Sequence, residues 1–106
     1  MPDIHLPKDW VCDGKTLKPK YGATSSNTWE FDGRYLKPRT GASASNSWEF
    51  DGRTLKPRVG VNSKNTWELD GRGNIKPRVG ANRNNTYSLN GNSILVVYGQ
   101  IILALW

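Results

Sequence analysis

The sequence predicts an all-β fold built from five tandem β-hairpin repeats, and three observations lead to this prediction. Similar segments begin at residues 10, 29, 48, 67 and 87, a period of 19 or 20 residues that is typical of repeat architectures. Each copy opens with alternating apolar and polar residues, as in Trp29-Glu30-Phe31, which indicates a half-buried strand. Each copy then continues into an Asp-Gly or Asn-Gly pair, a strong signal for a hairpin turn.

The turn length predicts the register of each hairpin and therefore its faces. A two-residue turn would place Phe31 opposite Arg34 and Trp29 opposite Leu36, so that Trp29, Phe31 and Leu36 share one face. The fourth copy carries an extra residue near Gly73, which predicts a bulge or a longer turn there. The predicted core takes one aromatic and one aliphatic residue from each copy: Trp10, Leu17, Trp29, Leu36, Trp48, Leu55, Trp67, Ile75, Tyr87 and Ile94.

The second strand of each of the first four copies ends in a basic-proline-basic triplet, such as Lys37-Pro38-Arg39. Proline cannot donate to a strand ladder, so this strand must be an edge at that point or leave the sheet there. The loop that follows is rich in Gly, Ser, Thr and Asn. An asparagine stands just before the next strand, where its side chain can close a turn on its own backbone.

The last copy differs, because the segment from Tyr87 to Trp106 contains no charged residue. Apolar residues on both faces predict a pair of buried strands, with a reversal at Gly99-Gln100. We expect the hairpins to close into a barrel-like or prism-like array around this C-terminal strand pair. A parallel β-solenoid is the alternative architecture, but it would stack Lys37 near Lys56, and stacked like charges are destabilising.

The remaining composition bounds the domain organisation. Residues 1–9 form an N-terminal lead that we expect to be mobile, and residues 10–106 form a single repeat domain. The single cysteine, Cys12, excludes an internal disulfide, and its place in the repeat makes it a small core residue. No secretory signal is visible, which predicts a cytoplasmic protein. The apolar segment from residue 94 onward is too short to span a membrane as a helix.

Residues that carry catalysis are scarce. His5 is the only histidine and lies in the lead, and one His with one Cys does not form a metal-ligand pattern. The aspartates of the repeats are explained by turn formation. We therefore predict no enzymatic activity, no cofactor and no metal site.

The net charge of +6, distributed through the repeats, favours an anionic partner. We predict a non-catalytic, repeat-built binding module that presents basic and polar-loop sites to a repetitive anionic ligand or a polysaccharide, so that the partner is a polyanion or a glycan. Repetition would add avidity. The candidate ligand-binding residues are Lys18, Lys20, Lys37, Arg39, Lys56, Arg58, Lys76, Arg78, Asn65 and Asn85.

The alternative is a structural, self-assembling protein in which the apolar C-terminal strands form a homo-oligomer interface. The candidate interface residues are Val97, Ile102, Leu103, Leu105 and Trp106. In outline the sequence also resembles the choline-binding repeats of bacterial surface proteins, which are aromatic-rich hairpins of similar length. It lacks their paired Trp and Tyr pattern, so the resemblance implies hairpins but neither a ligand nor binding residues.

Overall fold

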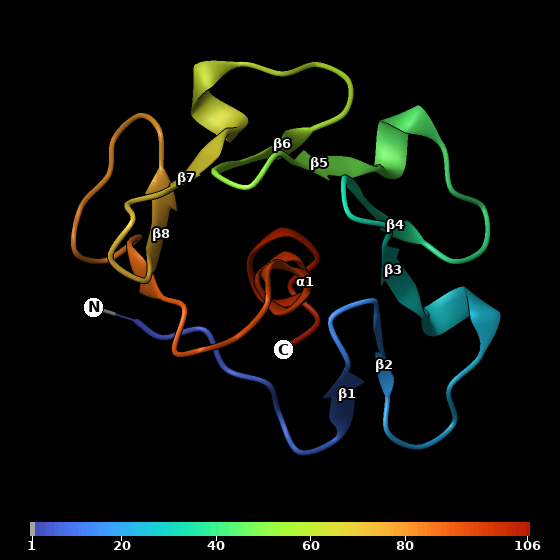
Figure 1. Ribbon diagram of the computed structural model, residues 1–106. Coiled ribbons are helices and arrows are strands. Elements are labelled where there is room, and N and C mark those ends of the chain that lie inside the picture. Colours follow the sequence, from blue (N-terminus) through green and yellow to red (C-terminus); the bar gives the residue numbers. More distant parts are fainter. Residues whose placement is uncertain (1) are drawn as a thin grey trace.

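The computed structural model describes residues 2–106, apart from the side chain of Ser63. The protein is all-β: nine short strands form one antiparallel sheet in sequence order, and the sheet curves around a short helical segment near the C-terminus (Figure 1). The strands are β1 (Trp10–Cys12), β2 (Thr16–Pro19), β3 (Trp29–Phe31), β4 (Tyr35–Pro38), β5 (Trp48–Phe50), β6 (Thr54–Pro57), β7 (Trp67–Leu69), β8 (Asn74–Pro77) and β9 (Tyr87–Ser88). The helical elements are three single 3₁₀ turns, η1 (Ser25–Asn27), η2 (Ala44–Asn46) and η3 (Ser63–Asn65), followed by α1 (Ile94–Val97) and a π-helical turn, η4 (Tyr98–Ile102).

The hairpin repeat is confirmed, but its predicted register is wrong. In the β3–β4 hairpin Phe31 pairs with Leu36, not with Arg34, and Trp29 pairs with Pro38. The pairing differs from the prediction by two residues on β4. Because side chains alternate with a period of two, this shift leaves every residue on its predicted face.

The turn explains the difference in register. Asp32 accepts hydrogen bonds at Oδ1 from the backbone N–H groups of Arg34, at 3.0 Å, and Tyr35, at 2.8 Å. Gly33 has a φ of 102°, and within this turn only Gly33 has a positive φ. The turn is therefore not a two-residue type I′ turn, which is the usual turn for an Asp-Gly pair and needs positive φ at both central residues. The aspartate carboxylate, not a backbone carbonyl, accepts the Tyr35 amide, and this lengthens the loop.

The predictions about the proline of the second strand and about the extra residue of the fourth copy are confirmed. Strand β4 pairs with β3 from Leu36 to Pro38 but with β5 only through Tyr35 and Leu36, so the strand leaves the sheet on one side before its proline. The fourth hairpin has the longer turn expected from its extra residue, since Leu69 pairs with Ile75 across a turn that contains two positive-φ glycines.

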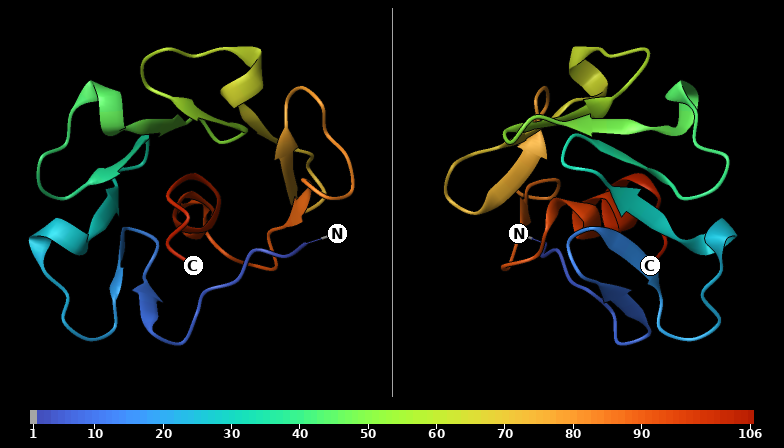
Figure 2. Two further views of the ribbon diagram at one scale, coloured as in Figure 1. Left: turned by 180° about the vertical axis from the view of Figure 1, so that it is seen from behind. Right: turned by 45° about the vertical axis from the view of Figure 1, so that its right-hand side comes forward.

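The C-terminal segment is helical, so the predicted pair of buried strands is wrong. The fifth copy contributes only β9, and the chain then turns at Asn90-Gly91 and enters α1 and η4 instead of a second strand. The helical segment runs through the middle of the ring of hairpins (Figures 1 and 2). Strands β2 to β8 pair with a neighbour on both sides, so they offer no free edge to a central segment. A helix satisfies its own backbone hydrogen bonds there.

The core lies between the sheet and this helical segment. One aliphatic residue from the second strand of each hairpin is fully buried, and the helical segment supplies the facing residues. The tryptophans of the first strands are half-buried and pack against the edge of this core instead of forming its centre. The fully or almost fully buried apolar residues are Ile4, Leu17, Leu36, Leu55, Ile75, Leu95, Val96, Val97 and Tyr98.

The N-terminal lead is part of the fold, in contrast to the mobile segment predicted. Ile4 is fully buried, and its amide donates to the Ser88 carbonyl at 2.7 Å. Asp3 and Ser88 form an isolated parallel bridge, and the lead runs from β9 towards β1 (Figure 1). The side chain of Gln100, in η4, binds the backbone of the lead. Its Nε2 donates to the Asp3 carbonyl and its Oε1 accepts from the His5 amide.

The sheet is open. Its order begins at β1 and ends at β9, and no pairing joins these two strands within the described part of the chain. The predicted closed array is therefore not formed by strand pairing. The antiparallel pairing of every neighbouring strand also excludes the alternative of a parallel β-solenoid.

Candidate functional site

The outer face of the sheet carries the basic residues that the sequence singles out. The register places Glu30 opposite Lys37, and the equivalent glutamates of the next two hairpins face Lys56 and Lys76. Ion pairs cross this face: Arg39 contacts Glu30 at 3.4 Å and Arg78 contacts Glu68 at 3.6 Å. Exposed pairs of this kind contribute little stability, about 0–1 kcal/mol, but each places a negative charge beside a basic residue of the face.

The eight candidate basic residues therefore fall into two groups. Lys37, Arg39 and Arg78 lie within ion-pair distance of a carboxylate, and the Arg58 guanidinium lies 4.4 Å from the centre of the Tyr35 ring. The four lysines make no ion pair with any described residue: Lys18, Lys20, Lys56 and Lys76.

The first hairpin differs from the others in its charge. Val11 occupies the position that is glutamate in the next three copies, and it pairs with Lys18. Val11 is 38% exposed and Tyr21, just after Lys20, is 79% exposed. This hairpin thus presents two lysines beside exposed apolar surface, with no glutamate on the paired strand.

The loop asparagines have a structural role. Asn65 accepts from the Asn62 amide at 2.9 Å and donates to the Gly60 carbonyl at 3.0 Å. Asn85 makes the same two bonds, to the Asn82 amide at 2.7 Å and the Gly80 carbonyl at 3.0 Å. Both candidate side chains use their amide groups to hold their own loops, as predicted for an Asx-closed turn, so a ligand would have to compete with these bonds.

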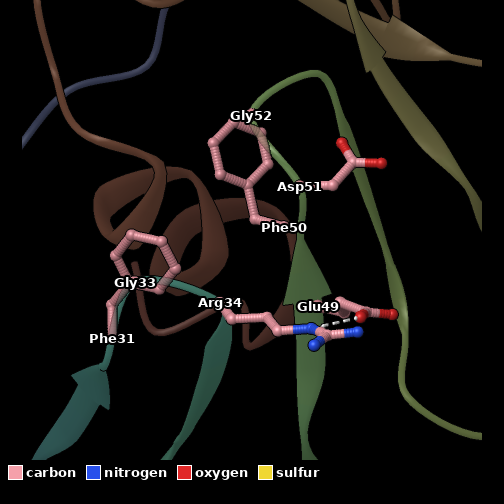
Figure 3. Close-up of a pocket in the computed structure, with 7 residues that line it drawn as sticks. All are labelled: Phe31, Gly33, Arg34, Glu49, Phe50, Asp51 and Gly52. Carbon is pink, nitrogen blue, oxygen red and sulfur yellow. Dashed lines mark hydrogen bonds and ion pairs between the residues drawn. The ribbon is translucent and has the colours of Figure 1, made fainter.

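The turns add basic residues that the sequence reasoning did not single out. One basic residue follows each Asp-Gly pair: Lys15, Arg34, Arg53 and Arg72. Arg34 Nε donates to Glu49 Oε2 at 3.0 Å, and this pair lines a cleft of about 560 Å³ beneath the rings of Phe31 and Phe50 (Figure 3). The signal was present in the repeat itself, because the position after Asp-Gly is basic in every one of the first four copies.

The turn aspartates are held in their ionised form. Hydrogen bonds from the backbone amides of Thr54 and Arg53, and from the Thr54 hydroxyl, lower the pKa of Asp51 to about 2. Backbone amides of the turns likewise lower the pKa of Asp13 and Asp32. These carboxylates stabilise the turns through hydrogen bonds and offset the positive charge of the basic residues that follow each Asp-Gly pair.

The candidate interface residues pack against the core of their own chain. Val97 is fully buried, and Ile102, Leu103 and Leu105 are half-buried against the core. The Trp106 ring lies 5.4 Å from the ring of Trp10, and its Nε1 donates to Gln100 at 3.4 Å. The C-terminal segment is therefore covered largely by its own chain.

A second concave region lies where the hairpin turns converge around the start of α1. It is an apolar pocket of about 340 Å³, and Phe31, Phe50 and Leu69 form part of its wall. The alternation of the first strand places this position on the same face as the predicted core residues, but alternation does not tell whether that face is fully covered.

No family model matches this chain, and neither a curated protein nor a solved structure shows significant similarity to it. Within residues 2–106, no helix is long and apolar enough to cross a membrane. The described side chains also form no group of three or more His, Cys, Asp or Glu that could hold a metal ion.

Proposed function

We propose that the protein is a non-catalytic binding module whose outer sheet face binds a repetitive anionic ligand, such as an anionic polysaccharide. The observation that carries this proposal is the uneven charge of the outer face. Across the strands, Glu30 lies opposite Lys37 in the second hairpin and Glu49 lies opposite Lys56 in the third. In the first hairpin the uncharged Val11 lies opposite Lys18. The first hairpin is therefore the primary contact in this proposal.

The other repeats support the same ligand more weakly. Lys56 and Lys76 have no ion pair among the described residues, and each lies at the position equivalent to Lys18. A long anion that contacts Lys18 can extend along the sheet to these positions on the third and fourth hairpins, and each added contact forms at a high effective concentration. The strands that carry them, β2, β6 and β8, belong to one sheet, which fixes their spacing.

Self-assembly through the C-terminal segment has no such observation in its favour. Val97 is fully buried and Trp106 packs on Trp10 of the same chain. A second copy would have to open the fold to reach the most buried of these residues.

The test restores the glutamate of the other repeats. Val11→Glu should weaken binding to heparin, used as the probe polyanion, because the new carboxylate faces Lys18. Val11→Gln introduces a side chain of the same size as glutamate but without its charge, so the affinity of this variant for heparin should match that of the unaltered protein. Val79→Glu makes the same change in net charge in an exposed loop and should have a much smaller effect than Val11→Glu.

Salt provides a second readout. A complex that neutralises about two charges should lose roughly tenfold in affinity between about 50 and 200 mM salt, because counterions are released on binding. Equal effects of Val11→Glu and Val79→Glu would show that only net charge matters. Absence of heparin binding, or binding that salt does not weaken, would refute the proposal.

A further inference from the structure

One position of the repeat surrounds the start of the central helical segment. It is the residue just before the Asp-Gly or Asn-Gly pair, and the second to fifth copies fix it in the same way. The amide of Phe31 donates to the Lys15 carbonyl, that of Phe50 to Arg34 and that of Leu69 to Arg53, at 2.8–2.9 Å. Leu89, in the fifth copy, makes the equivalent bond to Gly73 at 2.8 Å. Five copies thus place one residue each around α1: Cys12, Phe31, Phe50, Leu69 and Leu89.

This ring of residues does not close over the helix. Its four large members line the apolar pocket of about 340 Å³, together with Ile94 at the start of α1. At the first copy the small Cys12 approaches Ser93, with its Sγ 3.5 Å from Ser93 Oγ, and Gly14 lines the pocket instead of a large side chain. All four large members are half-buried, so the pocket presents apolar surface to the solvent.

The charges near the pocket balance one another. None of the described residues that line it is charged. The turns at its rim carry four aspartates and four basic residues, and the aspartates accept hydrogen bonds from their own turns, as Asp32 does from Arg34 and Tyr35. A charged ligand would therefore lose its hydration without a matching charge in the lining, which is unfavourable.

The volume and the polar side chains of the pocket indicate the size of the ligand and the polar group that it carries. A dry apolar cavity of about 150 Å³ in another protein binds benzene, so a volume of about 340 Å³ suits a molecule of two rings. Asn92 and Ser93 are the polar side chains in the wall. Asn92 is held in place because its Nδ2 donates to the carbonyls of Ile4 and Leu89. Ser93 can donate or accept one hydrogen bond.

We propose that the pocket formed by Phe31, Phe50, Leu69, Leu89 and Ile94 binds a small, uncharged aromatic molecule of about two rings, which Ser93 orients through one polar group. This site is separate from the outer face that carries the proposed anion binding. Apolar pockets with a few polar groups are the usual sites for small molecules.

The test uses 6-propionyl-2-(dimethylamino)naphthalene, an uncharged two-ring probe whose fluorescence rises when it leaves water for less polar surroundings. The unaltered protein should bind one equivalent, with saturation. Leu69→Phe should weaken binding at least tenfold, because it fills the pocket with the residue that the second and third copies already have at this position. Val79→Phe adds the same ring in an exposed loop outside the pocket and should leave the affinity unchanged.

A measurement on the unaltered chain covers the case in which Leu69→Phe does not fold. Titration with naphthalene should shift the methyl NMR signals of Leu69, Leu89 and Ile94 while leaving those of the exposed Val59 and Val79 in place. Unsaturable binding, equal affinity of the two phenylalanine variants, or shifts spread over the whole molecule would overturn the site. Tighter binding of naphthalene-1-sulfonate than of naphthalene would overturn the assignment of an uncharged ligand.

Discussion

Gly99 lies against Leu17 with no room for a side chain between them. A Cβ placed on Gly99 would lie 2.6 Å from Leu17 Cδ2 and 2.8 Å from Cη2 of Trp106. Leu17 belongs to β2 of the first hairpin and is fully buried. The absence of a Cβ at Gly99 is thus what lets the central helical segment approach the sheet at this point.

The first prediction concerns this contact. Gly99→Ala should lower the free energy of unfolding by about 1–3 kcal/mol, the usual cost of overpacking a core. Leu17→Ala should make room for the new methyl group, so Gly99→Ala should cost less in that background. Urea unfolding of the four members of this double-mutant cycle measures the coupling. Additive effects would show that the two residues do not meet.

The second prediction concerns the acid sensitivity of the turns. The pKa of Asp51 is lowered to about 2, chiefly by the amides of Thr54 and Arg53, so its carboxylate stabilises the folded state while ionised. This contribution is complete above the ordinary pKa near 3.8 and is lost as the pH falls from there towards 2. Asp51→Asn should therefore flatten the loss of stability in this window.

Chemical unfolding at several pH values between neutral and about 2 measures this effect. Asp9→Asn is the matched control, because Asp9 is an exposed carboxylate outside the Asp-Gly hairpin turns. If Asp9→Asn and Asp51→Asn flatten the pH profile equally, the turn hydrogen bonds are not the cause.

The third prediction concerns the alkaline range. Tyr98 is 1% exposed, and burial raises its pKa to about 12. The unfolded chain ionises this phenol near 10, so the stability that Tyr98 contributes is complete below that pH and is lost as the pH rises towards 12. Tyr98→Phe should make the protein less sensitive to alkali in this range.

Absorbance at 295 nm follows the phenolate directly. The difference between the titration curves of the unaltered protein and Tyr98→Phe should show one phenol that ionises near pH 12. The variant also loses the bond from the Tyr98 hydroxyl to the Asn46 carbonyl, which is long at 3.4 Å, so its stability at neutral pH should change little. A difference curve centred near 10 would place Tyr98 in water.

The candidate site was predictable only in part. The positions of Lys18, Lys37, Lys56 and Lys76 on one face followed from alternation, and their placement on the sheet surface agrees with it. Their charge compensation did not follow in detail, because it depends on which strand of the next hairpin lies alongside. Arg34, for example, meets Glu49 of the following repeat.

Residue patterns along the chain were sufficient to predict the repeating hairpins, their faces and the point where each second strand leaves the sheet. These features depend on local interactions: an alternation within three residues, an aspartate that binds the amides of its own turn, and a proline that lacks an N–H group. The exact register required the turn geometry of Asp32 and Gly33, which the residue pair alone does not fix.

Only the tertiary structure decided what the C-terminal segment becomes. A short, uniformly apolar segment is compatible with a buried strand or a buried helix. Its surroundings make the choice, because the hairpins pair with one another in sequence order and the lead pairs with β9. A segment at the centre of this ring has to form its own backbone hydrogen bonds. It therefore folds as a helix, and the residues that surround its first turn leave the open pocket at that end.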